Sequence, residues 1–131
     1  MKFKFILGDK LYSKLLQYSH NSFSRRLAKN INLPFDFFIG SSSYSFEALL
    51  KAKELNPYCT TIVDHASLNE KFELEQKLIE EKKYGFKLTG NSLHKWLINK
   101  ENLEHETSDF IVLPSHFAKK TFIDKGFSES K

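Results

Sequence analysis

Three apolar runs in this chain each end at a short polar loop, and a helical pattern of apolar positions follows each loop. The runs cover residues 35–39, 59–63 and 109–113, and the loops cover 41–43, 64–67 and 114–117. Strands that alternate with helices are typical of units in which parallel strands pair through crossover helices. The pattern therefore predicts an α/β fold with a Rossmann-like parallel sheet of three to four strands.

The helices are predicted from apolar residues at helical spacing and from the residues that stop them. Asp9 is a candidate cap, while Asn56-Pro57 and Gly85 are stop signals. We expect helices over about residues 10–30, 44–55, 68–83 and 92–107, and a last helix that Gly126 closes. The side chains expected to be buried are Phe46, Leu49, Leu50, Leu93, Trp96, Leu97, Leu103 and Phe117.

The remaining segments complete a single domain. Residues 2–7 carry apolar side chains between lysines and predict a short strand, and residues 20–22 predict a weak point in the helix that follows. Residues 84–90 predict a loop between two helices. We therefore expect one domain over residues 1–131, with a strand and helix region at 1–33 and the βα units at 34–127.

The first loop, Ser41-Ser42-Ser43, stands where a helix begins. Parallel sheets of this kind place their binding sites at the carboxyl ends of the strands, so all three loops are candidates. Exposed N–H groups at a helix start attract anions or sugar hydroxyls. The alternative is that one of these serines only caps the helix.

The second loop, Asp64-His65-Ala66-Ser67, has the richest chemistry. A carboxylate and an imidazole at a strand end can bond to substrate hydroxyls or move a proton, and histidine titrates near neutral pH. The alternative is a solvated loop in which Asp64 caps the next helix. In the third loop, Ser115 is the expected N-cap of the last helix, and His116 lies beside it.

Composition narrows the classes of function. The 131 residues are 40% hydrophobic, which is enough for one packed domain. The net charge of +4 suits an acidic partner but selects none, because the basic residues are spread along the chain. Cys59 is the single cysteine, so no internal disulfide can form, and a reducing cytoplasm is expected. No apolar run approaches the roughly 18 residues of a membrane span.

Several sharper chemistries have no support in the sequence. The five glycines form neither a dinucleotide-binding fingerprint nor a phosphate-binding loop. No Asp-x-Asp pair, no two histidines at zinc spacing and no nucleophile elbow are present. The sequence therefore identifies no certain catalytic residue and no metal ligand.

The region of the third strand resembles a passage in the family 4 glycosyltransferases, which have the GT-B fold. There an acidic helix leads into an Ala-Asp strand that ends Val-Pro-Ser-x-Phe, much as Glu104-x-Glu106 leads into residues 108–117 here. The segment from Thr121-Phe122 to Lys125-Gly126 resembles the helix and glycine that follow. Further similarities lie at residues 46–53, at Asp64–Ser67, where the family often has an acidic or histidine-containing serine motif, and at the Arg-Arg helix of residues 24–28.

The resemblance covers about residues 23–127 and has clear departures. Ser108 stands where alanine is usual, and the glycine-rich loop of the family's first strand is missing. The carboxyl-terminal domain of the family, with its paired glutamates and nucleotide-sugar pocket, is also missing. The resemblance therefore implies an incomplete GT-B N-terminal domain, the acceptor-side part of an enzyme.

Such enzymes transfer a sugar from a nucleotide-sugar to a saccharide or lipid-linked acceptor, usually with retention and without a bound metal. The resemblance implies that Asp64, His65 and Ser67 face the acceptor. The nucleotide-sugar donor would bind to a separate domain, so we expect no cofactor on this chain and no activity alone. The expected location is the cytoplasm, with peripheral attachment at the inner face of the membrane. Ser41, Ser42 and Ser43 would also bind the acceptor, and Ser115 and His116 would line the rim of the same cleft.

Two other interpretations stay open. The first is a non-catalytic, flavodoxin-like binding module, which should cover both faces of its sheet and use the same loops for a phosphate or a partner protein. The second is an accessory subunit at a membrane surface, where basic residues beside the apolar stripe of residues 10–30 contact anionic lipid. Nucleic-acid binding is not expected, because no element concentrates basic and aromatic residues.

Overall fold

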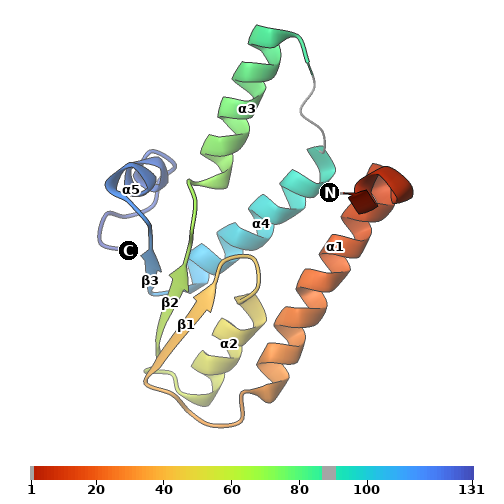
Figure 1. Cartoon of the computed structure of the whole chain (residues 1–131). Coiled ribbons are helices and arrows are strands. Elements are labelled where there is room, and N and C mark those ends of the chain that lie inside the picture. The colour runs from red at the N-terminus through yellow and green to blue at the C-terminus, as the bar shows by residue number, and fades with distance from the viewer. Residues whose placement is uncertain (1, 87–90) are drawn as a thin grey trace.

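The chain folds as an α/β protein, with five helices and an open three-stranded parallel sheet in the residues that the computed structural model describes, 2–86 and 91–131 (Figure 1). This confirms the predicted α/β class and the parallel sheet, and the arrangement is consistent with a Rossmann-like fold. The elements are α1 (Lys2–Asn30), β1 (Phe37–Ser41), α2 (Phe46–Leu55), β2 (Thr60–Asp64), α3 (Glu70–Tyr84), α4 (Asn91–Thr107), β3 (Phe110–Val112) and α5 (His116–Ile123).

The amino-terminal segment is helical, so the predicted strand at residues 2–7 is wrong. α1 begins at Lys2 and breaks at Gly8, whose φ of 70° and ψ of 152° are not helical. Glycine adopts positive φ without steric cost, so the chain can change direction there. The helix is continuous through residues 20–22, where we predicted a weak point. An isolated short strand gains little without a neighbour to pair with, which explains why the alternating pattern does not form one.

The strands lie side by side in the order β1-β2-β3. Ser41 of β1 lies opposite Asp64 of β2, and Asp64 lies opposite Val112 of β3. α2 contacts β1 and β2, and α1 and α4 pack on α2, so these helices cover one face of the sheet (Figure 1). The core of this layer is fully buried and includes Ala48, Leu49, Ala52, Cys59, Thr61 and Val63.

The other face of the sheet is apolar and open in the described residues. Ile39, Ile62 and Phe110 follow one another across the three strands, and Ile39 and Phe110 are exposed. Phe37 and Val112, two positions along β1 and β3, are exposed on the same face. Parallel sheets are normally covered on both faces. The open face is therefore an unusual feature of this fold.

Several predicted core positions are wrong. Leu50, Leu103 and Phe117 are all exposed by 47% or more, and Phe46 is only half-buried. On α2 the buried side chains are Ala48, Leu49 and Ala52, because these positions share the helix face that lies on the sheet. The predicted burial of Leu93 and the part of the predicted loop at residues 87–90 lie outside the described side chains and residues.

Cys59 is a buried free thiol just before β2, in the core of the sheet layer. Among the described residues, none of the helices combines the length and the hydropathy needed to cross a bilayer.

Candidate functional site

The three loops that follow the strands lie together at the carboxyl edge of the sheet (Figure 1). The amide of Ser42 donates to the carbonyl oxygen of Asp64 at 3.0 Å, and the amide of His65 donates to the carbonyl oxygen of Val112 at 3.0 Å. The β1–α2 loop, the β2–α3 loop and the end of β3 are therefore joined by backbone hydrogen bonds. All predicted site residues lie on or beside this edge.

The serine loop presents only part of its polar surface to solvent. Ser41 is exposed, and Ser42 is half-buried, with a hydroxyl that has no hydrogen-bond partner in the described residues. Ser43 is buried and has a φ of 73°. Its amide donates to Glu104 Oε2 at 2.5 Å, and its hydroxyl donates to Glu101 Oε1. The third serine therefore faces α4 and not the solvent.

The amino end of α2 is capped by a carboxylate from another helix. Ser45 is the N-cap by position, but its hydroxyl donates to the carbonyl oxygen of Ser41 at 2.6 Å and does not cap the helix. Glu104 Oε1 accepts instead from the amides of Ser45 at 2.7 Å and Phe46 at 3.1 Å. A simple serine cap, the alternative that we considered for this loop, is therefore wrong. The sequence permits the tight loop through Gly40, since a Cβ there would overlap the Ser45 side chain.

Glu104 is fully buried, so its charge depends on the groups that surround it. Burial raises the pKa of Glu104, while the amides of Ser45, Ser43 and Phe46 oppose that shift. Free amides at a helix start also stabilise a negative charge. The carboxylate therefore fixes the conformation of the serine loop and connects it to α4.

The polar side chains of the second loop differ in their exposure to solvent. Asp64 and Ser67 are exposed, whereas His65 is only 3% exposed. His65 Nε2 lies 2.9 Å from Glu70 Oε1, 3.1 Å from the Ser67 hydroxyl oxygen and 3.1 Å from the carbonyl oxygen of Leu68. Asp64 and Ser67 are therefore available to a ligand, and the imidazole lies behind them.

The next helix is not capped by Asp64, so that alternative is wrong. Asn69 caps α3, and its side-chain oxygen accepts from the amides of Lys71 at 3.1 Å and Phe72 at 3.4 Å. The amide of Asn69 in turn donates to the Thr121 hydroxyl at 3.0 Å, which ties this loop to α5. The second loop is therefore attached to both α3 and α5.

A buried cluster of titratable side chains lies beneath the two loops. Burial alone would lower the pKa of His65, but the bond to Glu70 and its charge outweigh burial and raise it. Burial would raise the pKa of Glu70, but His65 outweighs it and lowers the value. Burial and the neighbouring Glu70 raise the pKa of Glu101 to about 8. Burial lowers the pKa of His105 to about 4.

The cluster combines two imidazoles with two carboxyl groups. Its members are His65, Glu70, Glu101 and His105, but within residues 2–86 and 91–131 no group of three or more His, Cys, Asp or Glu residues is arranged to hold a metal ion. The two shifts favour an imidazolium at His65 beside a carboxylate at Glu70. The charges inside the cluster are therefore balanced.

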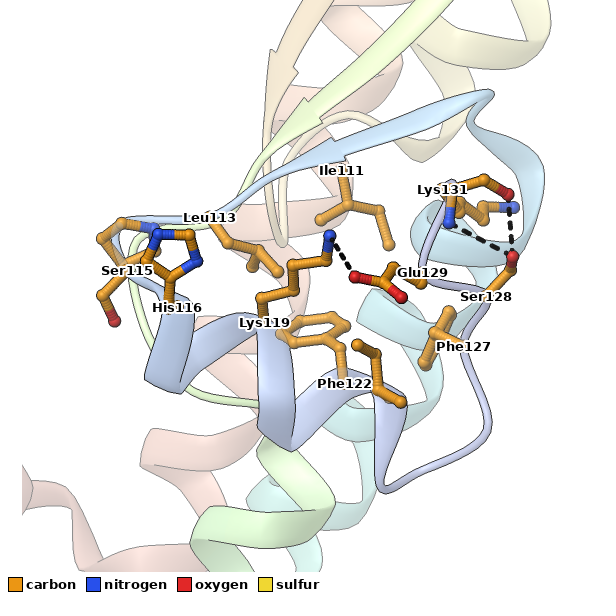
Figure 2. A pocket seen from close by; sticks show the side chains of 13 residues that line it. Ile111, Leu113, Ser115, His116, Lys119, Phe122, Phe127, Ser128, Glu129 and Lys131 are labelled. Atoms are coloured by element: carbon orange, nitrogen blue, oxygen red, sulfur yellow. Dashed lines mark hydrogen bonds and ion pairs between the residues drawn. The ribbon is translucent and has the colours of Figure 1, made fainter.

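The third loop begins α5 and borders a pocket. Ser115 caps α5 as predicted, because its side-chain oxygen accepts from the amide of Ala118 at 3.1 Å. His116 is exposed. The pocket has a volume of about 560 Å³ and lies between β3, α5 and residues 127–131. Ser115 and His116 lie at one end of it (Figure 2).

The pocket has an apolar floor and a polar rim. On the rim Lys119 Nζ lies 3.2 Å from Glu129 Oε1, so the two charges compensate each other (Figure 2). The amide of Ile111 donates to the carbonyl oxygen of Lys131 at 2.8 Å, which holds one wall against the edge of β3. The pocket therefore suits a ligand with both apolar and polar parts. Its floor is formed by Ile111, Leu113, Phe122, Ile123 and Phe127.

No site role was predicted from the sequence for Glu70, Glu101, Glu104 or His105. A signal was present, since Glu101, Glu104 and His105 are spaced three and four residues apart and share one face of α4. Buried polar residues on the inner face of a helix are exceptions to the usual pattern. This stripe marks the face of α4 that holds the two loops.

Comparison of this chain with protein-family descriptions, with curated proteins and with solved structures finds no match. The fold and the geometry of the carboxyl edge are therefore the observations on which a function can be proposed.

Proposed function

We propose that this chain is the acceptor-side part of a glycosyltransferase of the GT-B type, in which a sugar passes from a nucleotide-sugar to a saccharide or lipid-linked acceptor. The observation that carries the proposal is that three residues of the segment resembling this family have structural roles at the carboxyl edge. Glu104 holds the serine loop, Asp109 joins β2 and α2, and Ser115 caps α5. The resembling segment thus contains residues that shape the carboxyl edge.

The exposed residues of that edge have the chemistry to bind a sugar. Asp64, Ser67 and Ser41 present a carboxylate and two hydroxyls to solvent, and such groups bond well to sugar hydroxyls. His65 lies behind Ser67 and orients it. The pocket beside His116 would take the apolar part of the acceptor. The donor and the catalytic residues would belong to a separate domain, and this chain alone would be inactive.

The first prediction is that Asp64→Asn weakens acceptor binding about tenfold, which corresponds to about 1.4 kcal/mol, because a neutral amide bonds less strongly to a hydroxyl than a carboxylate does. The measurement is ¹H–¹⁵N NMR titration with mono- and disaccharides and with their short prenyl-diphosphate conjugates. We expect the amides of Ser41, Asp64 and Ser67 to shift with the ligand. The free nucleotide-sugar should leave them unchanged.

The matched control is Asp36→Asn, an exposed aspartate just before β1, at the opposite edge of the sheet. It should bind the acceptor like the wild type. Shifts that gather on other parts of the molecule, or an equal loss in both variants, would contradict the assignment of the carboxyl edge. Sugar transfer by the purified chain from a nucleotide-sugar would contradict the assignment of donor and catalytic residues to a separate domain.

The outer surface of α1 favours a second role, attachment to an anionic membrane surface. Leu11, Leu15 and Tyr18 are exposed on α1, and Lys14 lies among them. An apolar stripe with cations at its border binds anionic lipid through both burial and charge. Further along the same helix the exposed basic residues are Arg25, Arg26 and Lys29.

We predict that the double variant Leu11→Ser, Leu15→Ser reduces binding to vesicles with 30% anionic lipid by at least about tenfold, because each buried leucine contributes about 1.5 kcal/mol or more. Co-sedimentation with vesicles measures this. Leu78→Ser, at an exposed leucine on α3, is the control. Binding that is equal for neutral and anionic vesicles would remove this role.

The flavodoxin-like alternative is less well supported. A self-sufficient module of that type should bury both faces of its sheet. Here Ile39 and Phe110 are exposed on the open face in the described residues. That observation fits a domain that packs against further structure better than an isolated module.

A further inference from the structure

We propose that the outer face of α3 is a self-association surface, through which two copies of this chain pair their α3 helices antiparallel around a two-fold axis. The occupant of this surface is therefore a second copy of the same chain. The inference does not depend on the proposed function, because it uses none of the residues assigned to the acceptor.

α3 is exposed along its whole length. It stands away from the sheet and contacts α4 along one side (Figure 1). None of its 15 residues is buried. Leu78 is 48% exposed and Ile79 is 55% exposed, and they are neighbours near the middle of the helix. Helices in proteins gain most of their stability from packing an apolar face, so α3 has apolar surface available for a further contact.

Two opposite charges lie on either side of this apolar pair. Glu75 precedes Leu78 by three residues, and Lys82 follows Ile79 by the same interval. Glu75 and Lys82 are about two turns apart, so they share one side of α3. Both are exposed. Lys125 Nζ lies 2.5 Å from Oε2 of Glu75, but the glutamate side chain remains 56% exposed and is accessible to a second cation.

A two-fold axis at the level between Leu78 and Ile79 makes this arrangement self-complementary. In an antiparallel pair around that axis, Glu75 of each copy lies opposite Lys82 of the other. Leu78 likewise lies opposite Ile79, so the apolar side chains are central and the two ion pairs flank them. A parallel pair would place like charges opposite each other. The charges therefore favour a second copy of this chain in the antiparallel direction.

The size of this face predicts a weak and reversible dimer. A stable interface buries about 1,200–2,000 Å², which is more than four half-exposed aliphatic side chains supply. Exposed ion pairs add little to affinity, but they decide which partner binds and in which direction. The dimer should therefore form at high protein concentration, and added salt should weaken it because both ion pairs are exposed to solvent.

The test is sedimentation equilibrium of the wild type and of two charge reversals, Glu75→Lys and Lys82→Glu, from about 20 µM to about 1 mM. We expect the wild type to shift from monomer toward dimer as its concentration rises. Each reversal puts like charges at both symmetry-related contacts, so each variant alone should associate at least about tenfold more weakly. An equimolar mixture of the two variants should recover association, because every charged contact between them again joins opposite charges.

The matched control is Glu80→Lys, a charge reversal at an exposed glutamate on the opposite side of α3, which should associate like the wild type. A wild type that stays monomeric at about 1 mM overturns the proposal. So does a mixture that associates no better than either variant, or a dimer that both reversals leave unchanged. Concentration-dependent ¹H–¹⁵N NMR shifts of the Leu78 and Ile79 amides test the wild type alone, and their absence overturns the proposal even if a variant does not fold.

Discussion

Glu104→Ala is expected to lower the free energy of unfolding by about 3 kcal/mol. The Glu104 carboxylate accepts from the amides of Ser43, Ser45 and Phe46, and no other acceptor for them is present in the described residues. A buried donor that loses its partner costs about 1–3 kcal/mol, and the three amides share one small region, so their costs overlap. Urea denaturation at pH 7 followed by circular dichroism measures the difference.

Two further variants distinguish the hydrogen bonds from a general effect of mutation on α4. Glu104→Gln keeps one oxygen acceptor and loses the charge, so we expect a loss of only about 1 kcal/mol. Glu106→Ala removes an exposed carboxylate two residues away and should change stability by less than about 0.5 kcal/mol. Equal losses for Gln and Ala at position 104 would show that the oxygen acceptor is not what stabilises the loop.

Much of the fold could be predicted because it depends on local signals. Three such signals are the apolar runs of five residues, Gly85 after α3 and Ser115 before α5. Each signal acts within a few residues. Each of the three features lies where the sequence placed it or within two residues of that place. The segment at 2–7 failed for the opposite reason. A strand depends on a partner, and nothing local to these residues says whether one is present.

The interior of the candidate site could not be predicted because its contacts join distant parts of the chain. Ser43 and Glu104 are 61 positions apart in sequence. The loop pattern correctly suggested that Asp64, His65 and Ser67 lie at a strand end, but not that the imidazole turns inward. That orientation depends on Glu70 and on the polar stripe of α4, which reaches the loop only in the folded chain.

His105 received no role from the sequence, because it lies within a helical pattern and outside the three loops. It is fully buried between the rings of His65, Phe122 and Phe127, with ring centroids at 5.0, 5.1 and 5.8 Å. Both of its ring nitrogens lack a hydrogen-bond partner in the part of the chain that the structure describes. A buried N–H without a partner costs free energy, so this position is a source of instability.

His105→Leu is therefore expected to raise the free energy of unfolding by about 1 kcal/mol at pH 7, because leucine has a similar volume and buries no polar atom. The gain should be larger by about 2 kcal/mol at pH 5. Burial lowers the pKa of His105 to about 4, against 6.5 for an ordinary histidine. Between these values the unfolded chain binds a proton that the folded chain does not, so wild-type stability falls as the pH falls through that window.

Urea denaturation of both proteins at pH 7 and pH 5 isolates this residue, because contributions that other groups make equally to both proteins cancel in the difference. His116→Gln, at an exposed histidine, should change stability by less than about 0.5 kcal/mol at either pH. A leucine variant that is less stable than the wild type at both values would mean that the imidazole contributes more through its edge contacts with the phenyl rings than its unpaired nitrogens cost. In that case His105 would stabilise the cluster beneath the loops. The acid sensitivity of the fold would then have to come from other groups with a lowered pKa, which include Glu70 and Asp109.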